Sequence, residues 1–146
     1  MTVDIREILL VEDNMADARM TMMALEEKKI ANKIVHVKDG AEALDYIFAR
    51  GQYDTREANS LPVLILLDLK MPKVNGIEVL ESLKSNERTR KIPVTVFTSS
   101  QEDPDVKRCY ELGVNSYVVK PLDFDSFNNV VQDIGLYWLV VNHLNG

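Results

Sequence analysis

The pattern of hydrophobic and polar positions divides the chain into short apolar runs and longer segments with helical spacing. Several of the runs are apolar at every position, which is typical of parallel strands that are covered on both faces. Five strands are predicted from these runs and from short segments that alternate or are rich in β-branched residues, at Ile5–Val11, Lys33–Val37, Val63–Leu67, Val94–Thr98 and Ser116–Val119.

A segment with apolar residues at three- and four-residue steps follows each predicted strand and indicates a helix. The predicted helices cover Ala16–Lys29, Ala41–Ala49, Gly76–Ser85, residues 104–112 and residues of about 123–144. The expected buried face of the first helix comprises Ala16, Met20, Met23 and Ala24.

Local signals mark the ends of these helices. Asn14 and Asp123 are expected to act as N-caps, and Pro104 suits the first turn of a helix. Gly51 and Gly113 are expected to end the helices that precede them.

Strict alternation of strands and helices predicts an α/β fold with helices on both faces of a parallel sheet. For five such units we expect a flavodoxin-like, doubly wound (βα)5 fold with strand order 2-1-3-4-5. The chain has 146 residues, which suits a single domain over residues 1–146. Ligands in this fold bind at the carboxyl ends of the strands, where the strand order reverses.

Composition narrows the range of partners. The net charge of −6 disfavours direct binding to nucleic acid or to anionic lipid. No apolar run approaches the roughly 20 residues of a membrane span, and the first residues do not resemble a signal peptide. The lone Cys109 cannot form an internal disulfide. We therefore expect a cytoplasmic protein.

Polar residues that are able to bind an ion or to react lie at the predicted strand ends. Glu12 and Asp13 follow the first strand and Asp68 follows the third, which is its expected neighbour. Three carboxylates so close repel one another and raise one another's pKa unless a cation lies between them. A hard divalent ion with oxygen ligands, Mg²⁺, is the expected cation.

Asp68 can then act as a nucleophile toward phosphorus, with Lys120 and the hydroxyl of Thr98 as donors to the phosphoryl oxygens. Simpler interpretations exist for each residue. Asp68 alone could be a solvated cap. Glu12 and Asp13 could be acidic residues favoured by the dipole of the first helix, but this leaves their crowding with Asp68 unexplained.

The landmarks are Glu12-Asp13, Asp68-x-x-Met71-Pro72-x-x-x-Gly76, Thr98-Ser99 and Tyr117-x-x-Lys120-Pro121. With these landmarks in this order, the chain resembles the receiver family of response regulators from about Ile8 to Val131. The resemblance implies that Asp68 is the phosphoacceptor and that Lys120 pairs with the phosphoryl group. It further implies that Mg²⁺ is held by Glu12, Asp13, Asp68 and the backbone carbonyl of Lys70. Thr98 and Tyr117 would form a switch pair that remodels the face built from the fourth helix, fifth strand and fifth helix.

The segment Glu12-Asp13-Asn14-x-Ala16-Asp17-x-Arg19, a long loop near Gln52–Ser60 and the tail Tyr137-Trp138-Leu139 are similar to the small regulators of phytochrome-type sensor kinases. The resemblance implies a sensor histidine kinase as partner. It also implies a cis peptide bond between Lys120 and Pro121. Lys70 and Ser100 occupy positions that vary in the family and affect the lifetime of the phosphorylated state.

The end of the last helix carries apolar residues that lie partly off its core face: Leu136, Tyr137, Leu139, Val140 and Leu144. Three explanations stay open: packing on the chain's own long loop, self-association as a homodimer, or docking to a kinase. His36, His143 and Cys109 have no partner in the sequence and are interpreted as structural.

Competing functions differ in what the site would do. The chain could be a switch that signals through its surface, or a phosphorelay intermediate that passes the phosphoryl group to a histidine.

A phosphatase of the haloacid-dehalogenase type is disfavoured because Lys70, not an acid, stands two residues after Asp68. A nucleotide-binding flavodoxin-like module lacks a glycine-rich loop. A pseudo-receiver would not take up phosphate. We therefore expect a signalling phosphoacceptor and not a classical enzyme.

Overall fold

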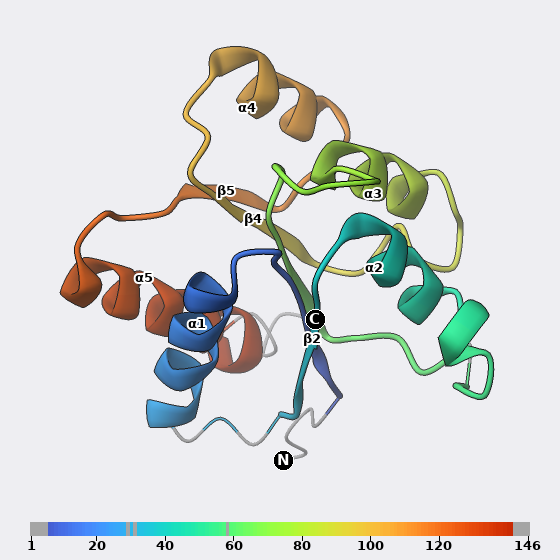
Figure 1. Ribbon diagram of the computed structural model, residues 1–146, viewed down its shortest axis with the longest axis horizontal. Helices are drawn as coiled ribbons and strands as arrows, with labels where there is room; N and C mark the ends of the chain where they lie inside the picture. Colours follow the sequence, from blue (N-terminus) through green and yellow to red (C-terminus); the bar gives the residue numbers. More distant parts are fainter. Residues whose placement is uncertain (1–5, 29, 31, 58, 142–146) are drawn as a thin grey trace.

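The computed structural model describes residues 6–28, 30, 32–57 and 59–141 of the chain (Figure 1). Strands and helices alternate in the predicted order. The strands are β1 (Ile8–Val11), β2 (Ile34–Val37), β3 (Leu64–Leu67), β4 (Val94–Thr98) and β5 (Ser116–Val119). The helices are α1 (Met15–Glu27), α2 (Gly40–Ile47), α3 (Gly76–Lys84), α4 (Asp103–Glu111) and α5 (Phe124–Leu136). Two short segments complete the list, the 3-10 helix η1 (Gly51–Tyr53) and the π-helical segment η2 (Tyr137–Val141).

All five strands are parallel and follow the order β2-β1-β3-β4-β5. This confirms the predicted flavodoxin-like arrangement. Val11 pairs with Val37 on one side and with Leu67 on the other. The carboxyl ends of β1 and β3 are therefore level with each other, and the residues that follow them meet at one edge of the sheet.

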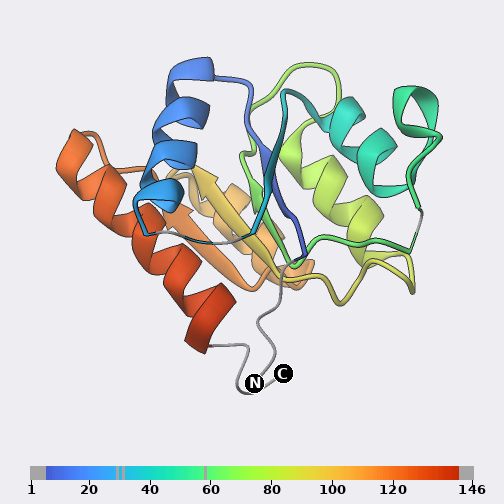
Figure 2. The same cartoon turned by 90° about the horizontal axis from the view of Figure 1, so that it is seen from below.

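Helices cover both faces of the sheet (Figures 1 and 2). α1 and α5 lie together on one face, and α2, α3 and α4 lie on the other. β1 shows why the apolar runs have no polar face: Leu9 and Val11 pack toward α2 and α3, whereas Ile8 and Leu10 pack toward α1 and α5. Each fully buried large side chain stabilises the fold by roughly 1.5–3 kcal/mol.

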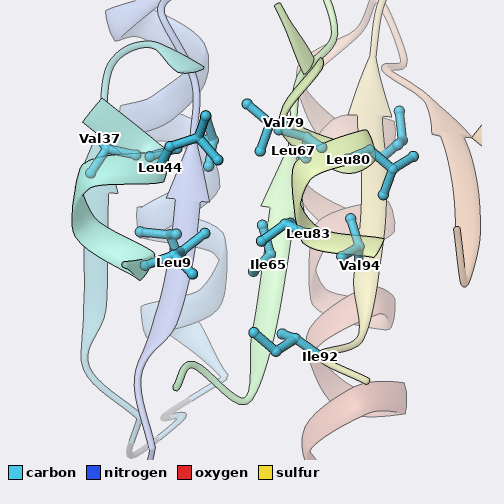
Figure 3. Packing of buried hydrophobic residues seen from close by; sticks show 14 of the residues in the cluster. Leu9, Val37, Leu44, Ile65, Leu67, Val79, Leu80, Leu83, Ile92 and Val94 are labelled. Atoms are coloured by element: carbon cyan, nitrogen blue, oxygen red, sulfur yellow. The ribbon is translucent and has the colours of Figure 1, made fainter. Parts of the chain in front are cut away.

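The larger core lies between the sheet and the helices α2 to α4. Figure 3 shows the part of it beside α2 and α3. Leu44 of α2 and Leu80 and Leu83 of α3 point toward the strands and are packed with Ile65 and Val94. The second core joins Phe97 of the sheet with α5, where the ring of Phe127 meets it edge-on at 5.1 Å between centroids.

The buried face of α1 differs from the prediction. The structure buries Ala18, Thr21, Ala24 and Leu25, whereas Ala16 is exposed and Met23 is 52% exposed. The apolar pattern predicted the wrong face because the row of buried residues on α1 includes the polar residue Thr21. Its hydroxyl donates to the backbone carbonyl of Asp17 at 2.8 Å, so this polar residue is buried with its hydrogen bond satisfied.

The expected helix ends are confirmed at Asn14 and Asp123, whose side chains accept from backbone amides. Pro104 lies in the first turn of α4, and Gly113 follows that helix with φ +90°. The expectation for Gly51 was wrong. α2 ends at Ile47 with Phe48 as its C-cap, and Ala49 takes the left-handed conformation with φ 53°. Gly51 instead begins η1.

The segment after α2 is held by aromatic and charged side chains. Arg56 donates to the backbone carbonyls of Tyr46 and Ser60, and its guanidinium lies 3.7 Å above the ring of Tyr46. The hydroxyl of Tyr46 donates to Glu7, and that of Tyr53 donates to Glu42 at 2.5 Å. This segment therefore packs on α2, on the opposite side of the sheet from α5 (Figures 1 and 2).

Two expectations for the last helix need correction. Leu139 is only 8% exposed and packs in the α1–α5 core with Trp138 beside it, because the π-helical turn changes the faces that follow Leu136. The end of α5 does not pack on the Gln52–Ser60 loop, which lies across the sheet. Residues 142–144, His143 included, lie outside the described residues, as does Ile5 of the first predicted strand, and the side chain of Val140 is not described.

None of the helices in the described residues combines the length and apolar character required to cross a membrane.

The start of α3 depends on a close backbone approach. A Cβ atom added at Gly76 would lie 2.2 Å from the carbonyl oxygen of Asp68 and 2.6 Å from the Cα of Leu69. These are backbone atoms of the strand end, so they cannot move aside without displacing Asp68.

We expect Gly76→Ala to lower the free energy of unfolding by about 1–3 kcal/mol, because the new methyl group overpacks against backbone. Gly135→Ala is the matched control. At that position the new Cβ meets only the ends of the Leu25 and Ile30 side chains, and a helix interior gains from alanine. Urea unfolding of both variants measures the difference. Equal stability of the two variants would contradict the role of Gly76.

Candidate functional site

Three carboxylates meet where β1 and β3 end. Glu12 and Asp13 follow β1, and Asp68 follows β3 with its backbone amide donating to the carbonyl of Val11 at 3.0 Å. Each residue offers a carboxylate oxygen, and these three oxygens lie within 4.8 Å of one another. Glu12 and Asp68 are buried and Asp13 is exposed. The structure thus brings together the carboxylates that the strand order predicts.

Lys120 enters this group from the end of β5. Its backbone amide donates to the carbonyl of Thr98 at 2.8 Å, which fixes the residue beside β4. Its ammonium nitrogen lies 2.6 Å from Glu12 Oε1 and 3.4 Å from Asp68 Oδ2. The side chain is only 8% exposed. The lysine therefore neutralises part of the buried negative charge.

A further carboxylate, Asp17, also contacts the lysine, with its Oδ2 2.8 Å from Lys120 Nζ. Asp17 is not among the site residues predicted from the sequence. One signal was present, because Asp17 lies in the first turn of the helix that begins directly after Glu12 and Asp13. Its partner, however, is 103 residues away in the sequence.

The charges in this group shift one another's protonation. Burial raises the pKa of Glu12 to about 7, a hydrogen bond from Lys120 opposes this shift, and the charge of Asp68 adds to it. Burial alone would lower the pKa of Lys120, but hydrogen bonds to Asp17 and Glu12 and the charge of Asp68 raise it above its usual range. Lys120 therefore stays charged at neutral pH.

His36 on β2 supports the same strand end. Its ring nitrogen Nε2 donates to the backbone carbonyl of Glu12 at 2.7 Å, because a carbonyl can only accept. The side chain of Glu12 is also held, because its Oε2 accepts a hydrogen bond from the backbone amide of Asn14 at 3.1 Å. The segment that carries Glu12 is thus held from two sides. This partner of His36 could not be predicted from the sequence, because the contact depends on the β1–β2 pairing.

The donor set suits a hard divalent cation. Three carboxylate oxygens from two strand ends match the oxygen ligands that Mg²⁺ and Mn²⁺ accept. No histidine or cysteine is part of this group, so a softer metal is not favoured.

Comparison with known proteins decides the family. The sequence pattern of the response regulator receiver domain matches residues 8–132. The chain belongs to the receiver domain family of response regulators. The match covers every strand and the first turns of α5, including all the residues of the site.

Relatives of this receiver domain include a probable regulatory protein and a response regulator. The probable methanogenesis regulatory protein FilR2 of Methanothrix harundinacea is 45% identical over 95% of this chain and 87% of its own length. The response regulator Rcp1 of Synechocystis is 39% identical over 90% of this chain and 88% of its own.

Solved structures agree. The phosphorylated cyanobacterial phytochrome response regulator RcpA superimposes with a TM-score of 0.88 at 37% identity, over 94% of this chain and 96% of that one. The Mn²⁺-bound form of Rcp1 gives a TM-score of 0.87. The fold and the regulator class of this receiver domain are therefore established.

In this receiver domain the hydroxyls expected to form the switch meet at a third residue. Thr98 Oγ1 accepts from the backbone amide of Ser100 at 3.3 Å, and the Tyr117 hydroxyl donates to the carbonyl of Ser100 at 2.9 Å. Ser100 Oγ donates to Asp105 of α4 at 2.6 Å. Thr98 and Tyr117 are thus connected through Ser100, whereas the ammonium of Lys120 contacts the carboxylates of Glu12, Asp17 and Asp68.

Two remaining expectations concern the loops of the receiver domain. Lys70 follows Asp68 by two residues, and its side chain is exposed. Binding of a metal ion by its backbone carbonyl stays a prediction. The expected cis bond was wrong: the peptide between Lys120 and Pro121 is trans, as are the other peptide bonds of the described residues. Trans is the lower-energy isomer for a bond before proline unless the surroundings favour cis.

The raised pKa of Glu12 predicts a stability that depends on pH. Between the usual pKa of 4.5 and about 7, the folded state keeps the proton on Glu12 while the unfolded chain releases it. The stability contributed by protonated Glu12 is therefore lost as the pH rises through this interval. With metal removed by a chelator, the wild type should lose about 1–3 kcal/mol relative to Glu12→Gln between about pH 5 and pH 8. Denaturant unfolding at several pH values measures this. A difference between the two proteins that does not change with pH would contradict it.

Proposed function

We propose that this receiver domain accepts a phosphoryl group on Asp68 in a Mg²⁺-dependent reaction and signals through the face formed by α4, β5 and α5. The observation that carries the proposal is the position of Asp68. It is buried among carboxylates that suit a divalent cation, with the Lys120 ammonium 3.4 Å from its Oδ2.

In the proposed reaction a carboxylate oxygen of Asp68 attacks phosphorus and forms an acyl phosphate. The bond from phosphorus to the donor breaks, and the donor leaves with the electron pair and takes up a proton. Asp68 Oδ1 is held by the backbone amide of Leu69 at 2.8 Å, which orients the group. Lys120 offers a charge-assisted hydrogen bond to a phosphoryl oxygen, and the Thr98 hydroxyl is proposed to offer a second one.

The proposed holders of Mg²⁺ are Glu12, Asp13, Asp68 and the backbone carbonyl of Lys70. A bound Mg²⁺ neutralises negative charge on the phosphoryl group. The Mn²⁺-bound form of Rcp1 shows that a related regulator takes a divalent cation, and the three carboxylates of this chain offer oxygen ligands of the kind that such cations accept. Loss of the phosphoryl group to water is proposed to be slow and self-catalysed.

The proposed donor is a sensor histidine kinase of the phytochrome type, because RcpA is a phytochrome response regulator of similar sequence. The proposed setting is the cytoplasm, with Cys109 as a buried free thiol whose pKa burial raises to about 11. The net charge of −6 disfavours nucleic acid as a partner.

The proposed output face exposes apolar side chains from all three of its elements. Tyr110 of α4, Val119 of β5 and Phe124 of α5 are exposed, and Leu122 between β5 and α5 is fully exposed. Apolar groups on this face suit a protein partner. The bonds from Ser100 to Thr98, Tyr117 and α4 connect this face to the strand end next to Asp68.

Incubation with Mg²⁺ and acetyl phosphate should add one phosphoryl group to the protein, measured by intact mass. Asp68→Asn removes the nucleophile but keeps the size of the side chain, and it should abolish the adduct. Omission of Mg²⁺ should also abolish it, because the charge at the site then repels the donor.

An adduct that persists in Asp68→Asn would place the phosphoryl group on another residue and overturn the assignment. No adduct on a folded, Mg²⁺-bound wild type would favour a receiver that binds without covalent modification. Rapid release of phosphate without an adduct would favour a hydrolase.

The end of α5 is proposed as a surface for self-association. Leu136 and Tyr137 are 47% and 51% exposed. Beside them lies a depression of about 350 Å³ lined by Asn115, Ser116, Asp133, Ile134, Tyr137 and Trp138. A neighbouring copy could fill this depression with an apolar side chain.

We expect the wild type to sediment as a dimer at micromolar concentration and Leu136→Glu to sediment as a monomer, because a charge would then be buried at the interface. Phe124→Glu makes the same change at the other end of α5 and should leave the dimer intact. Sedimentation velocity compares the three proteins. A monomeric wild type, or a dimer lost only in Phe124→Glu, would contradict this surface.

A further inference from the structure

Asp17 contacts the site from α1, yet it lies outside the carboxylates that could hold a cation. Its backbone is fixed at both polar atoms: the amide donates to the N-cap Asn14, and the carbonyl accepts from Thr21. The side chain is 27% exposed and extends to Lys120 at 2.8 Å. Asp17 is therefore held by the first turn of α1 in a position from which it reaches the lysine.

The hydrogen bonds of Lys120 explain why this contact matters. An ammonium has three N–H donors, and three carboxylates lie around it: Glu12 at 2.6 Å, Asp17 at 2.8 Å and Asp68 at 3.4 Å. Two of these partners, Glu12 and Asp68, are proposed ligands of the cation. A divalent cation would compete for their oxygens and would also repel the ammonium. Because Asp17 is not a proposed ligand of the cation, its oxygens remain available to accept hydrogen bonds from the ammonium.

A lysine side chain has a flexible four-carbon stem and does not hold its own position. With only Glu12 and Asp68 as partners, the ammonium would lose the hydrogen bonds that fix its position when the cation occupies the site. We propose that Asp17 is a positioning residue that keeps Lys120 beside Asp68 while the cation and the phosphoryl group are bound. This inference rests on the proposed phosphorylation of Asp68.

Asp17 also has a simpler structural role to distinguish, since an acidic residue in the first turn stabilises a helix through its dipole. Asp125 in the first turn of α5 provides a control, because it is an exposed carboxylate that is also in the first turn of a helix. Asp125→Ala loses the same interaction with a helix dipole without approaching the site.

The test measures binding of beryllofluoride, a phosphoryl mimic, by calorimetry at saturating Mg²⁺. Asp17→Ala should weaken binding about tenfold, the effect of losing one charge-assisted hydrogen bond. Asp17→Asn should recover part of the affinity, because the amide oxygen still accepts from the ammonium. In a Lys120→Met background, Asp17→Ala should cause no further loss. Asp125→Ala should bind as the wild type does.

A second measurement observes the lysine directly. In the beryllofluoride complex the Lys120 ammonium should give a resolved ¹H–¹⁵N signal, since hydrogen-bonded N–H groups exchange slowly with water. The signal is assigned by its absence in Lys120→Met. It should disappear in Asp17→Ala and persist in Asp17→Asn and Asp125→Ala.

The outcomes separate the two proposals. A wild type that binds no beryllofluoride in the presence of Mg²⁺ would overturn the proposed function and this inference with it. A wild type that binds, with Asp17→Ala equal to it and its ammonium signal unchanged, would overturn only the role of Asp17. An equal loss in the Lys120→Met background would show that Asp17 acts through its charge or through α1, and not through the lysine.

Discussion

The repulsion between carboxylates at the ends of β1 and β3 is the constraint on which the site depends. The strands are neighbours in a parallel sheet, so Glu12 and Asp68 cannot be separated without changing the fold. Lys120 reaches them from β5 and compensates part of the charge. Burial nevertheless raises the pKa of Glu12 to about 7. The site is thus an unfavourable concentration of charge that the sheet imposes and that a bound cation would relieve.

The sequence predicts those features that depend on the chain direction and on local pattern. The all-apolar run Leu64–Leu67 indicates a central strand, and right-handed crossovers then leave few arrangements. From the strand order alone, Glu12, Asp13 and Asp68 are expected to meet, and they do. Helix caps such as Asn14 and Asp123 were also predictable, since their side chains bond only to the next turn.

The features that the sequence did not predict depend on contacts between distant elements or on exceptions to pattern. Thr21 is polar but buried, since its hydroxyl is satisfied within its own helix, and this shifts the buried face of α1 away from Met23. Ala49 adopts a left-handed conformation that glycine usually takes. Asp17 and His36 contact the site through side chains whose reach depends on the packing of α1 and β2. None of these contacts leaves a periodic signal.

Ser100 makes four hydrogen bonds that join β4, β5 and α4. Its amide donates to Thr98, its carbonyl accepts from Tyr117, and its hydroxyl donates to Asp105 and accepts from the amide of Glu102. Because one residue serves all three, the elements cannot rearrange one at a time without leaving polar groups unpaired. In the proposed switch, a half-rearranged molecule would therefore be higher in energy than either end state. A stronger input would then change how many molecules have rearranged and not how far each one has moved, so a graded signal would reach the proposed partner as a proportion of the population.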